Sequence, residues 1–301
     1  MISGRTIGLW WLGLLLTPLA TAQQLESSNL PILHIYTDGV TIPDEPKLMA
    51  TMTLIDNGPG QRNHPDDPPP DYEGRVGIEK RGSTSQQLYD KKSYALETRD
   101  EFGENRNVSL LGLPAENDWV LHGPYSDKSL LRNALAYLIG ESIMPYAPRT
   151  RFVELMINDS YWGIYLLTEK IKRDQNRVAI SKLDPTVESG DELTGGYILK
   201  LDKETGAASD GFFALFDPIP GSFQRTFFQY HYPKPADINL AQENYINDYI
   251  DDLERLLQSD DYADSLHGYW QQLDVATFID YLLINELAIN VDAYRLSTYL
   301  Y

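Results

Sequence analysis

The first half of the chain alternates apolar and polar residues at short range, which is the pattern of half-buried β-strands. Such runs cover residues 30–36, 48–55, 74–80 and 92–98. A stretch rich in proline and glycine at 57–71 interrupts the pattern, but the strand pattern resumes directly after it. We therefore expect this stretch to be a surface loop and not a linker between domains.

Two apolar runs at 152–157 and 161–167 flank a polar turn at 158–160, and this combination predicts a β-hairpin. Two more strands are predicted at 195–201 and 225–230, where apolar and aromatic residues again dominate. Most of the predicted strands therefore come before residue 170.

Three segments space their apolar residues three and four positions apart, as amphipathic helices do. The faces consist of Leu131, Ala134, Leu135 and Leu138 in the first segment, of Tyr245, Tyr249, Ile250, Leu253, Leu256 and Leu257 in the second, and of Phe278, Ile279, Leu282, Leu283 and Leu287 in the third. Ser126 or Asp127 can cap the first helix, which we expect to pack on the sheet, and Asp274 can cap the third. A β-rich first half and a helix-rich second half predict an α+β fold with room for a cleft between two lobes.

Composition limits the possible functions. The 301 residues include no cysteine, so a disulfide, a thiolate zinc site and a cysteine nucleophile are excluded. With 25 basic against 44 acidic residues, the net charge is −19. This acidity argues against nucleic-acid binding, which requires surplus Lys and Arg to neutralise phosphates.

The N-terminus has the features of a secretory signal peptide. Arg5 precedes the apolar run 7–16, and small residues at 20–22 offer a cleavage site after Ala22. An uncleaved anchor helix is the alternative, but the run is shorter than the roughly 20 residues that a membrane span needs. We expect a signal peptide at 1–22 and a mature domain at 23–301 that is secreted, periplasmic or on the cell surface, with no stable membrane span after cleavage.

Common catalytic motifs are absent from the sequence. It contains no phosphate-binding P-loop, no Gly-x-Ser-x-Gly elbow and no His-Glu-x-x-His metal motif. The five histidines lie far apart, at 34, 64, 122, 231 and 267. Neither a hydrolase of these types nor a histidine-based metalloenzyme is indicated.

Charged residues inside otherwise apolar elements form a more specific pattern. They occur in Arg-Gly-Ser-Thr-Ser at 81–85, Lys-Lys-Ser-Tyr at 91–94, Leu-Arg-Asn at 131–133 and Gly-Ile-Tyr-Leu-Leu-Thr-Glu at 163–169. In their order and spacing these motifs resemble the CotH (spore coat protein H) kinase family, and the resemblance extends from about residue 30 to the last residue. It implies a two-lobed atypical protein-kinase-like fold that binds ATP with Mg²⁺ or Mn²⁺ and phosphorylates Ser or Thr of a protein partner.

The resemblance also assigns residues to ATP. It implies that Lys91 or Lys92 holds the phosphates, with Arg81 and the loop at Gly82 close by. Neighbouring strand residues face opposite ways, so only one of the two lysines can point into a given cleft. The remaining ATP-binding positions that it implies are Arg132, Asn133, Glu169 and Lys200. Each of these side chains also has an ordinary structural interpretation, as a solvated residue at the end or on the face of an element.

Asp292 is similar to the family's catalytic aspartate, which accepts a hydrogen bond from the substrate hydroxyl. Its alternative interpretation is a turn residue that ends the preceding helix. Asn290 and Ser297 are the nearest oxygen-bearing side chains that can assist a metal ion. Family members continue to a Trp-Asp-x-Asp segment that holds the metal. Because the sequence stops at Tyr301, we expect an incomplete C-terminus, the main metal ligand beyond it, and an inactive fragment.

Two functions of different class follow. The first is a secreted kinase that transfers phosphate from ATP to Ser or Thr of an unidentified extracellular or surface protein. The second is a non-catalytic adhesion or scaffold module that keeps the same fold. An aspartate on the strand that would follow residue 301 distinguishes the two.

Overall fold

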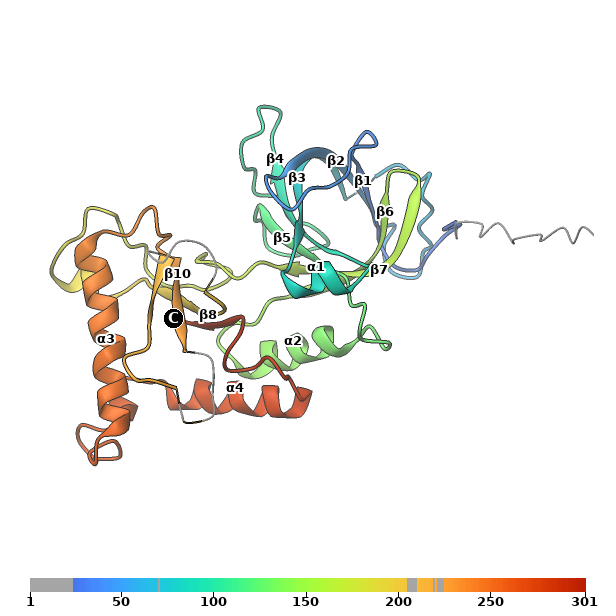
Figure 1. Cartoon of the computed structure of the whole chain (residues 1–301). Coiled ribbons are helices and arrows are strands. Elements are labelled where there is room, and N and C mark those ends of the chain that lie inside the picture. Colours follow the sequence, from blue (N-terminus) through green and yellow to red (C-terminus); the bar gives the residue numbers. More distant parts are fainter. Residues whose placement is uncertain (1–23, 70, 205–209, 219, 221–224) are drawn as a thin grey trace, which may run out of the picture.

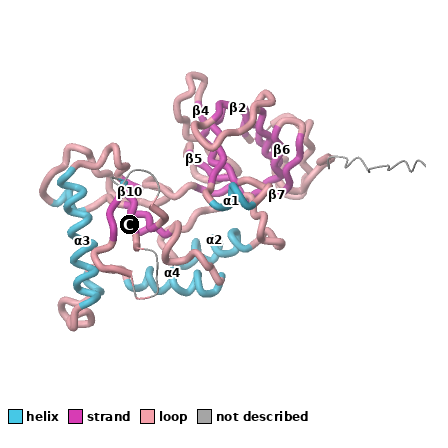
Figure 2. The backbone as a smooth tube through the Cα atoms, in the orientation of Figure 1, coloured by secondary structure: helices cyan, strands magenta, loops and turns pink. Residues whose placement is uncertain are grey.

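A computed structural model of the chain describes residues 24–301 except 70, 205–209, 219 and 221–224. The expected signal peptide at 1–22 lies outside these residues. A barrel of strands is built by the first half of the chain, and a smaller sheet and two long helices are built by the second half (Figure 1). Helices and strands alternate with long loops in the second half, as Figure 2 shows.

The barrel has seven strands and is closed. They are β1 (Ile32–Tyr36), β2 (Leu48–Ile55), β3 (Tyr72–Arg81), β4 (Ser93–Arg99), β5 (Asp118–His122), β6 (Thr150–Ile157) and β7 (Ser160–Glu169), in the spatial order β1-β2-β3-β4-β5-β7-β6. Parallel pairing of β1 with β6 closes it, with Ile32 opposite Glu154, while the other neighbours are antiparallel. Alternate side chains point inward and form one core around Trp119 and Tyr165, both of which are fully buried.

The predicted hairpin is confirmed at β6 and β7. Asn158 adopts a left-handed conformation at the turn, with φ of 50°. Its side-chain oxygen accepts a hydrogen bond of 2.8 Å from the backbone N–H of Thr37. The turn that joins β6 to β7 is therefore also tied to the end of β1, on the other side of the closing strand pair.

A second, four-stranded sheet has the order β11-β8-β10-β9. Its strands are β8 (Ile198–Leu201), β9 (Gly211–Phe213), β10 (Phe227–Tyr232) and β11 (Thr298–Leu300). The helix α3 (Leu240–Gln258) packs on this sheet through Ile246 and Ile250 and begins with a capping box formed by Asn239 and Gln242.

The other helices are α1 (Thr84–Leu88), α2 (Arg132–Ile143) and α4 (Val275–Ala288), with short 3₁₀ turns at Asp191–Thr194 and Tyr269–Gln271. The expected cap at Asp274 is confirmed, because its carboxylate accepts hydrogen bonds from the first turn of α4. α2 and α4 lie against each other at Gly140, where a β-carbon would come within 3.6 Å of Ile284 and 3.0 Å of Ala147. A β-carbon at Gly140 would therefore crowd Ala147, while its contact with Ile284 on α4 would be an ordinary one.

The helix faces expected to be buried are exposed on both α2 and α4. The exposed residues are Leu131, Leu135, Leu138, Ile139 and Ile143 near or on α2, and Phe278, Ile279, Leu282, Leu283 and Leu287 on α4. The expectation that the face of α2 packs on the sheet is wrong, because α2 contacts the barrel mainly at β6 and contacts α4 more extensively. We call the exposed apolar residues of α2 and α4 named above the α2/α4 apolar surface.

Such a surface favours self-association in water. Leu287→Gln is expected to reduce binding of a hydrophobic dye and to reduce concentration-dependent light scattering, with little change in Tm. Leu240→Gln is the matched control, since Leu240 on α3 has the same 70% exposure as Leu287 but lies outside this surface. Equal effects of the two substitutions would show that the α2/α4 apolar surface has no special tendency to associate.

The fold is a mixed α+β arrangement with a sheet-rich first part, as the sequence predicts. The second half is mixed and not predominantly helical, because β8 to β11 form a sheet there. The closed barrel is an additional finding that the local patterns do not contain. No helix within the part of the chain that the structure describes is long and apolar enough to cross a membrane.

Candidate functional site

The loop after β3 is shaped around Gly82. This glycine has φ of +106°, and a β-carbon there would lie 2.2 Å from the Ser85 hydroxyl oxygen, so a larger residue does not fit without rearrangement. The loop leads directly into α1, whose start is exposed. Arg81, which ends β3, is also exposed. The Arg81–Gly82 loop therefore has the tight turn and the accessible cation expected from the sequence.

Lys91 and Lys92 have different partners, but both precede β4, so the alternation of strand residues expected from the sequence does not apply to them. The Lys91 amine donates a 2.6 Å hydrogen bond to the Ile164 carbonyl and lies 4.6 Å from the centre of the Tyr165 ring. Burial lowers the pKa of Lys91, and the Glu154 carboxylate opposes this effect only in part. Lys92 instead donates to the carbonyls of Gln86 and Tyr89 and so holds the C-terminal end of α1.

The barrel meets the second sheet at a set of polar residues that we call the barrel–sheet junction: Arg81, Thr84, Lys200, Asp202, Lys203 and Ser297. The Lys203 amine donates to the Thr84 hydroxyl at 3.2 Å and so connects β8 to α1. The Lys200 amine lies 2.6 Å from the Asp202 carboxylate, which also accepts a 3.2 Å hydrogen bond from the Ser297 hydroxyl. The junction thus contains two predicted site residues from the second half, Lys200 and Ser297.

Arg81 belongs to the same region through its electrostatic effect. Burial raises the pKa of the Tyr299 phenol, while Arg81 opposes the rise and Asp202 adds to it. Tyr299 lies opposite Lys200 in the pairing of β11 with β8. The bond from Lys203 to Thr84 thus brings the residues after β8 next to the start of α1, although more than a hundred residues separate them in the sequence.

Asp292 lies on an exposed segment between α4 and β11. Its carboxylate forms a 2.7 Å ion pair with Arg295, and its backbone N–H donates to the Asn290 side-chain oxygen at 3.2 Å. The Asn290 amide in turn donates to Asn285, which is buried on α4. Asp292 is thus held in a turn at the helix end, with its carboxylate open to solvent.

Arg132 and Asn133 lie in the first turn of α2 and are exposed. The Arg132 side chain is 76% exposed, and its guanidinium is 3.8 Å from Asp127. The N-cap residue of α2 is Leu131, which makes no side-chain capping bond, so the expected cap at Ser126 or Asp127 is wrong. The Asp127 carboxylate still accepts a hydrogen bond from the Arg132 backbone N–H at 2.9 Å. In this structure both residues face solvent at the beginning of α2.

The Glu169 carboxylate is fully buried and already paired. It accepts hydrogen bonds from the Arg149 guanidinium at 2.8 and 3.1 Å and from the Arg149 backbone N–H at 3.1 Å. The Arg177 guanidinium is 3.9 Å away. The interpretation of Glu169 as a solvated strand end is therefore wrong, and its carboxylate is paired with a cation of the protein.

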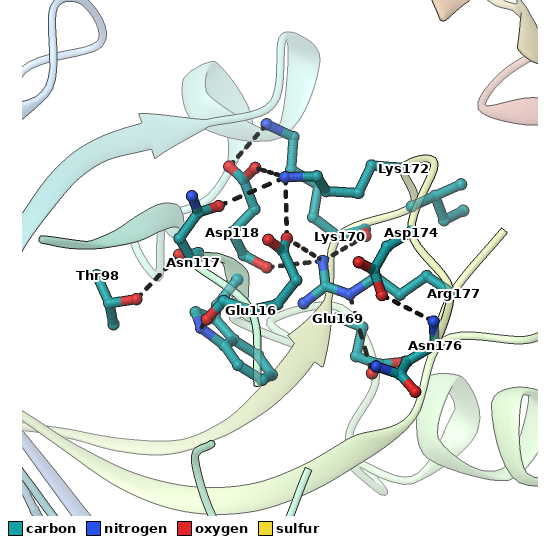
Figure 3. Close-up of polar contacts among 12 residues, drawn as sticks. Thr98, Glu116, Asn117, Asp118, Glu169, Lys170, Lys172, Asp174, Asn176 and Arg177 are labelled. Carbon is teal, nitrogen blue, oxygen red and sulfur yellow. Dashed lines mark hydrogen bonds and ion pairs between the residues drawn. The ribbon is translucent and has the colours of Figure 1, made fainter. Parts of the chain in front are cut away.

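Glu169 is part of a larger charged cluster at the start of β5 (Figure 3). The Lys172 amine contacts the carboxylates of Asp118 at 2.8 Å and Glu116 at 2.9 Å. Arg177, whose side chain is 1% exposed, lies 3.3 Å from Glu116, donates to the carbonyls of Asp118 and Lys170, and stacks over Trp119. This buried ionic cluster fastens the segment after β7 to the start of β5.

The cluster also affects the pKa of the Asp118 carboxylate. Burial alone would raise the pKa of Asp118, but the charges and hydrogen bonds of Lys170 and Lys172 outweigh burial, so its pKa lies below the usual value. Asp118 therefore stays ionised at neutral pH. One sequence signal of this cluster is a run of two acids and an asparagine at 116–118, at the start of the apolar strand β5.

The two residues proposed for a divalent metal, Asn290 and Ser297, both make hydrogen bonds within the protein. Asn290 is engaged with Asn285 and Asp292, and Ser297 donates to Asp202, which already pairs with Lys200. Among residues 24–301, with the gaps stated above, no group of three or more His, Asp and Glu is placed to hold an ion. A protein site for Mg²⁺ normally supplies one or two free carboxylates, and neither Asn290 nor Ser297 carries a carboxylate.

Comparison with known proteins matches one family. The family model described as "CotH kinase protein" matches residues 78–301, which is more than half of the chain and includes every predicted site residue. The match begins in β3, so β1 and β2 lie outside it. No curated protein matches the chain.

Proposed function

We propose, from the premise that the chain belongs to the CotH kinase family, that it is an ATP-dependent protein kinase acting on Ser or Thr of an extracellular or surface protein. The observation that carries the proposal is the family match, which spans the Arg81–Gly82 loop and the Asp292 segment together. The barrel–sheet junction supports it, because it gathers cations from both parts of the chain. Phosphoryl transfer depends mainly on such fixed positive groups.

In this proposal the barrel forms the first lobe of a kinase-like fold, and β8 to β11 with α3 and α4 belong to the second. Arg81 and Lys200 bind the phosphates of ATP, with the Gly82 loop close to them. Lys91 or Lys92 adds a further cation from the barrel. Asp292 accepts a hydrogen bond from the acceptor hydroxyl and orients it for attack on the γ-phosphorus. Mg²⁺ or Mn²⁺ is proposed as the ion that accompanies ATP.

The alternative is an extracellular adhesion or scaffold module. The ion pairs of Glu169 with Arg149 and of Asp292 with Arg295 favour it, since both carboxylates are satisfied within the protein. The two functions differ in a direct test. A kinase binds ATP and transfers its γ-phosphate, whereas a module does neither.

The first test is nucleotide affinity. Replacing both Lys91 and Lys92 by Ala is expected to weaken ATP binding by about 10- to 100-fold, because a hydrogen bond from a charged group contributes roughly 1.5–3 kcal/mol. Isothermal calorimetry on the full-length gene product measures this. The single variants then show which lysine is responsible, and Lys182→Ala, at an exposed position, is the control.

Unchanged affinity in the double variant would remove both lysines from the site. Absence of ATP binding by the wild-type protein would contradict the kinase proposal itself and favour the module. Transfer of radiolabelled γ-phosphate to the protein itself or to surface proteins of the same cell would establish the reaction.

A further inference from the structure

Asp202, directly after β8, joins more partners than any predicted site residue at the barrel–sheet junction. One carboxylate oxygen contacts the Lys200 amine at 2.6 Å and accepts the Ser297 hydroxyl at 3.2 Å. The other oxygen accepts the backbone N–H of Lys203 at 2.8 Å. Hydrogen bonds that involve a charged group are about twice as strong as neutral ones. A single side chain therefore links β8 to the residue that precedes β11.

The segment that Asp202 holds is conformationally strained. Tyr294 and Ser297 adopt left-handed conformations, with φ of 70° and 51°, although neither is glycine. Such conformations cost of order 1 kcal/mol or more each and persist only where surrounding contacts impose them. The hydrogen bond from Ser297 to Asp202 is one such contact, and the bond between Tyr281 and Thr298 at 2.7 Å is another. Ser297 and Thr298, which make these two bonds, lie shortly after Asp292 in the sequence.

Asp202 also lies next to the connection between the two parts of the chain. The neighbouring Lys203 reaches Thr84 on α1, and the β8/β11 register places Thr298 opposite Leu201. Burial alone would raise the pKa of Asp202, but its bonds with Lys200 and Lys203 outweigh burial and lower it. The carboxylate is ionised at neutral pH, as this set of bonds requires.

We infer that Asp202 is a positioning residue, which orients Lys200 and fixes the segment 290–297 that carries Asp292. Asp202 does not contact substrate in this assignment. It acts through the Lys200 amine on one side and the Ser297 hydroxyl on the other. The expected effect of Asp202 on catalysis rests on the proposed kinase function. Its expected effect on the stability of segment 290–297 does not.

The structural consequence is tested by hydrogen exchange of the full-length protein. Asp202→Asn keeps the size of the side chain and removes its charge, so amides at 294–300 are expected to exchange about tenfold faster, while barrel amides are unchanged. Asp71→Asn is the matched control, because Asp71 also anchors a loop, through a 3.0 Å bond to the Leu111 N–H, but on the barrel. Unchanged exchange at 294–300 in the Asp202 variant would overturn the inference.

The kinetic consequence is tested by phosphoryl transfer. Asp202→Asn is expected to lower kcat by about 100-fold with a smaller change in KM for ATP, since a misplacement of about 1 Å has an effect of that order. The effects of Asp202→Asn and Ser297→Ala should be non-additive, because the first weakens and the second removes the same bond. Additive effects, or a wild-type kcat, would refute the positioning role. If the wild-type protein transfers no phosphate, the proposed function fails, and the exchange experiment still decides the role of Asp202.

Discussion

Arg177→Met is expected to lower the free energy of unfolding by about 3–5 kcal/mol, the usual effect of removing one partner from a buried ion pair. Methionine retains much of the length and apolar contact of arginine but removes its charge. Glu116 would then lose an ion pair of 3.3 Å, and the carbonyls of Asp118 and Lys170 would lose their donor. Those groups are buried, so water cannot replace the lost bonds without opening the end of β5.

Urea denaturation monitored by tryptophan fluorescence measures the effect, since Trp119 lies beneath Arg177. Arg255→Met is the matched control. Arg255 pairs with Asp252 at 3.0 Å and Asp251 at 3.6 Å on α3, but its side chain is 55% exposed. That substitution is expected to change stability by at most about 0.5 kcal/mol. If the two variants lose equal stability, the buried ionic cluster contributes no more than a surface ion pair.

The elements that local sequence patterns predict are those whose signal is contained within a few residues. The hairpin of β6 and β7 follows from a polar turn between two apolar runs, and the cap of α4 follows from Asp274. Closure of the barrel is not predictable in this way, because the pairing of β1 with β6 joins residues more than a hundred positions apart. No local propensity encodes such a pairing.

The burial of a helix face is likewise not predictable from local sequence patterns. The spacing of Phe278, Leu282 and their neighbours correctly predicts a helix, yet those residues are exposed on α4. Periodicity shows that a helix has an apolar face, and only the positions of the other elements determine what covers it. In the α2/α4 apolar surface the periodicity of the helices is correctly predicted, but the apolar residues are exposed.

Among the charged residues that stand out within apolar elements, Glu169 lies in a buried environment, whereas Arg81 and Arg132 are exposed. The partners of each depend on the fold. Glu169 stands out in the sequence because a carboxylate ends an apolar strand. Its actual partners are Arg149, directly before β6, and Arg177, in the segment after β7. They become neighbours of Glu169 only through the fold of the β6–β7 hairpin and of the segment that follows it. Asp202 gave no such signal, since it follows the end of a short strand, where acids are common.

Asp292→Asn is expected to lower kcat for phosphoryl transfer by about 100- to 10,000-fold, the range for loss of a general base or an orienting carboxylate. Asparagine keeps the shape and the turn, and it can still accept a hydrogen bond from Arg295. It lacks the negative charge that makes the oxygen a strong acceptor for the hydroxyl proton. Affinity for ATP should stay within about threefold of wild type, because this contact forms with the acceptor and not with the nucleotide.

The matched control for this prediction is Asp252→Asn. Asp252 on α3 is exposed and pairs with an arginine three residues later at 3.0 Å, just as Asp292 pairs with Arg295 at 2.7 Å. Loss of such an exposed pair by itself changes stability little, so a fall in kcat confined to Asp292→Asn must come from the position of the carboxylate. The measurement is initial-rate transfer of radiolabelled phosphate by full-length proteins, with ATP affinity determined separately by calorimetry. Equal rates for wild type and Asp292→Asn would return Asp292 to the role of a helix-ending turn residue, and the catalytic carboxylate would have to be sought elsewhere.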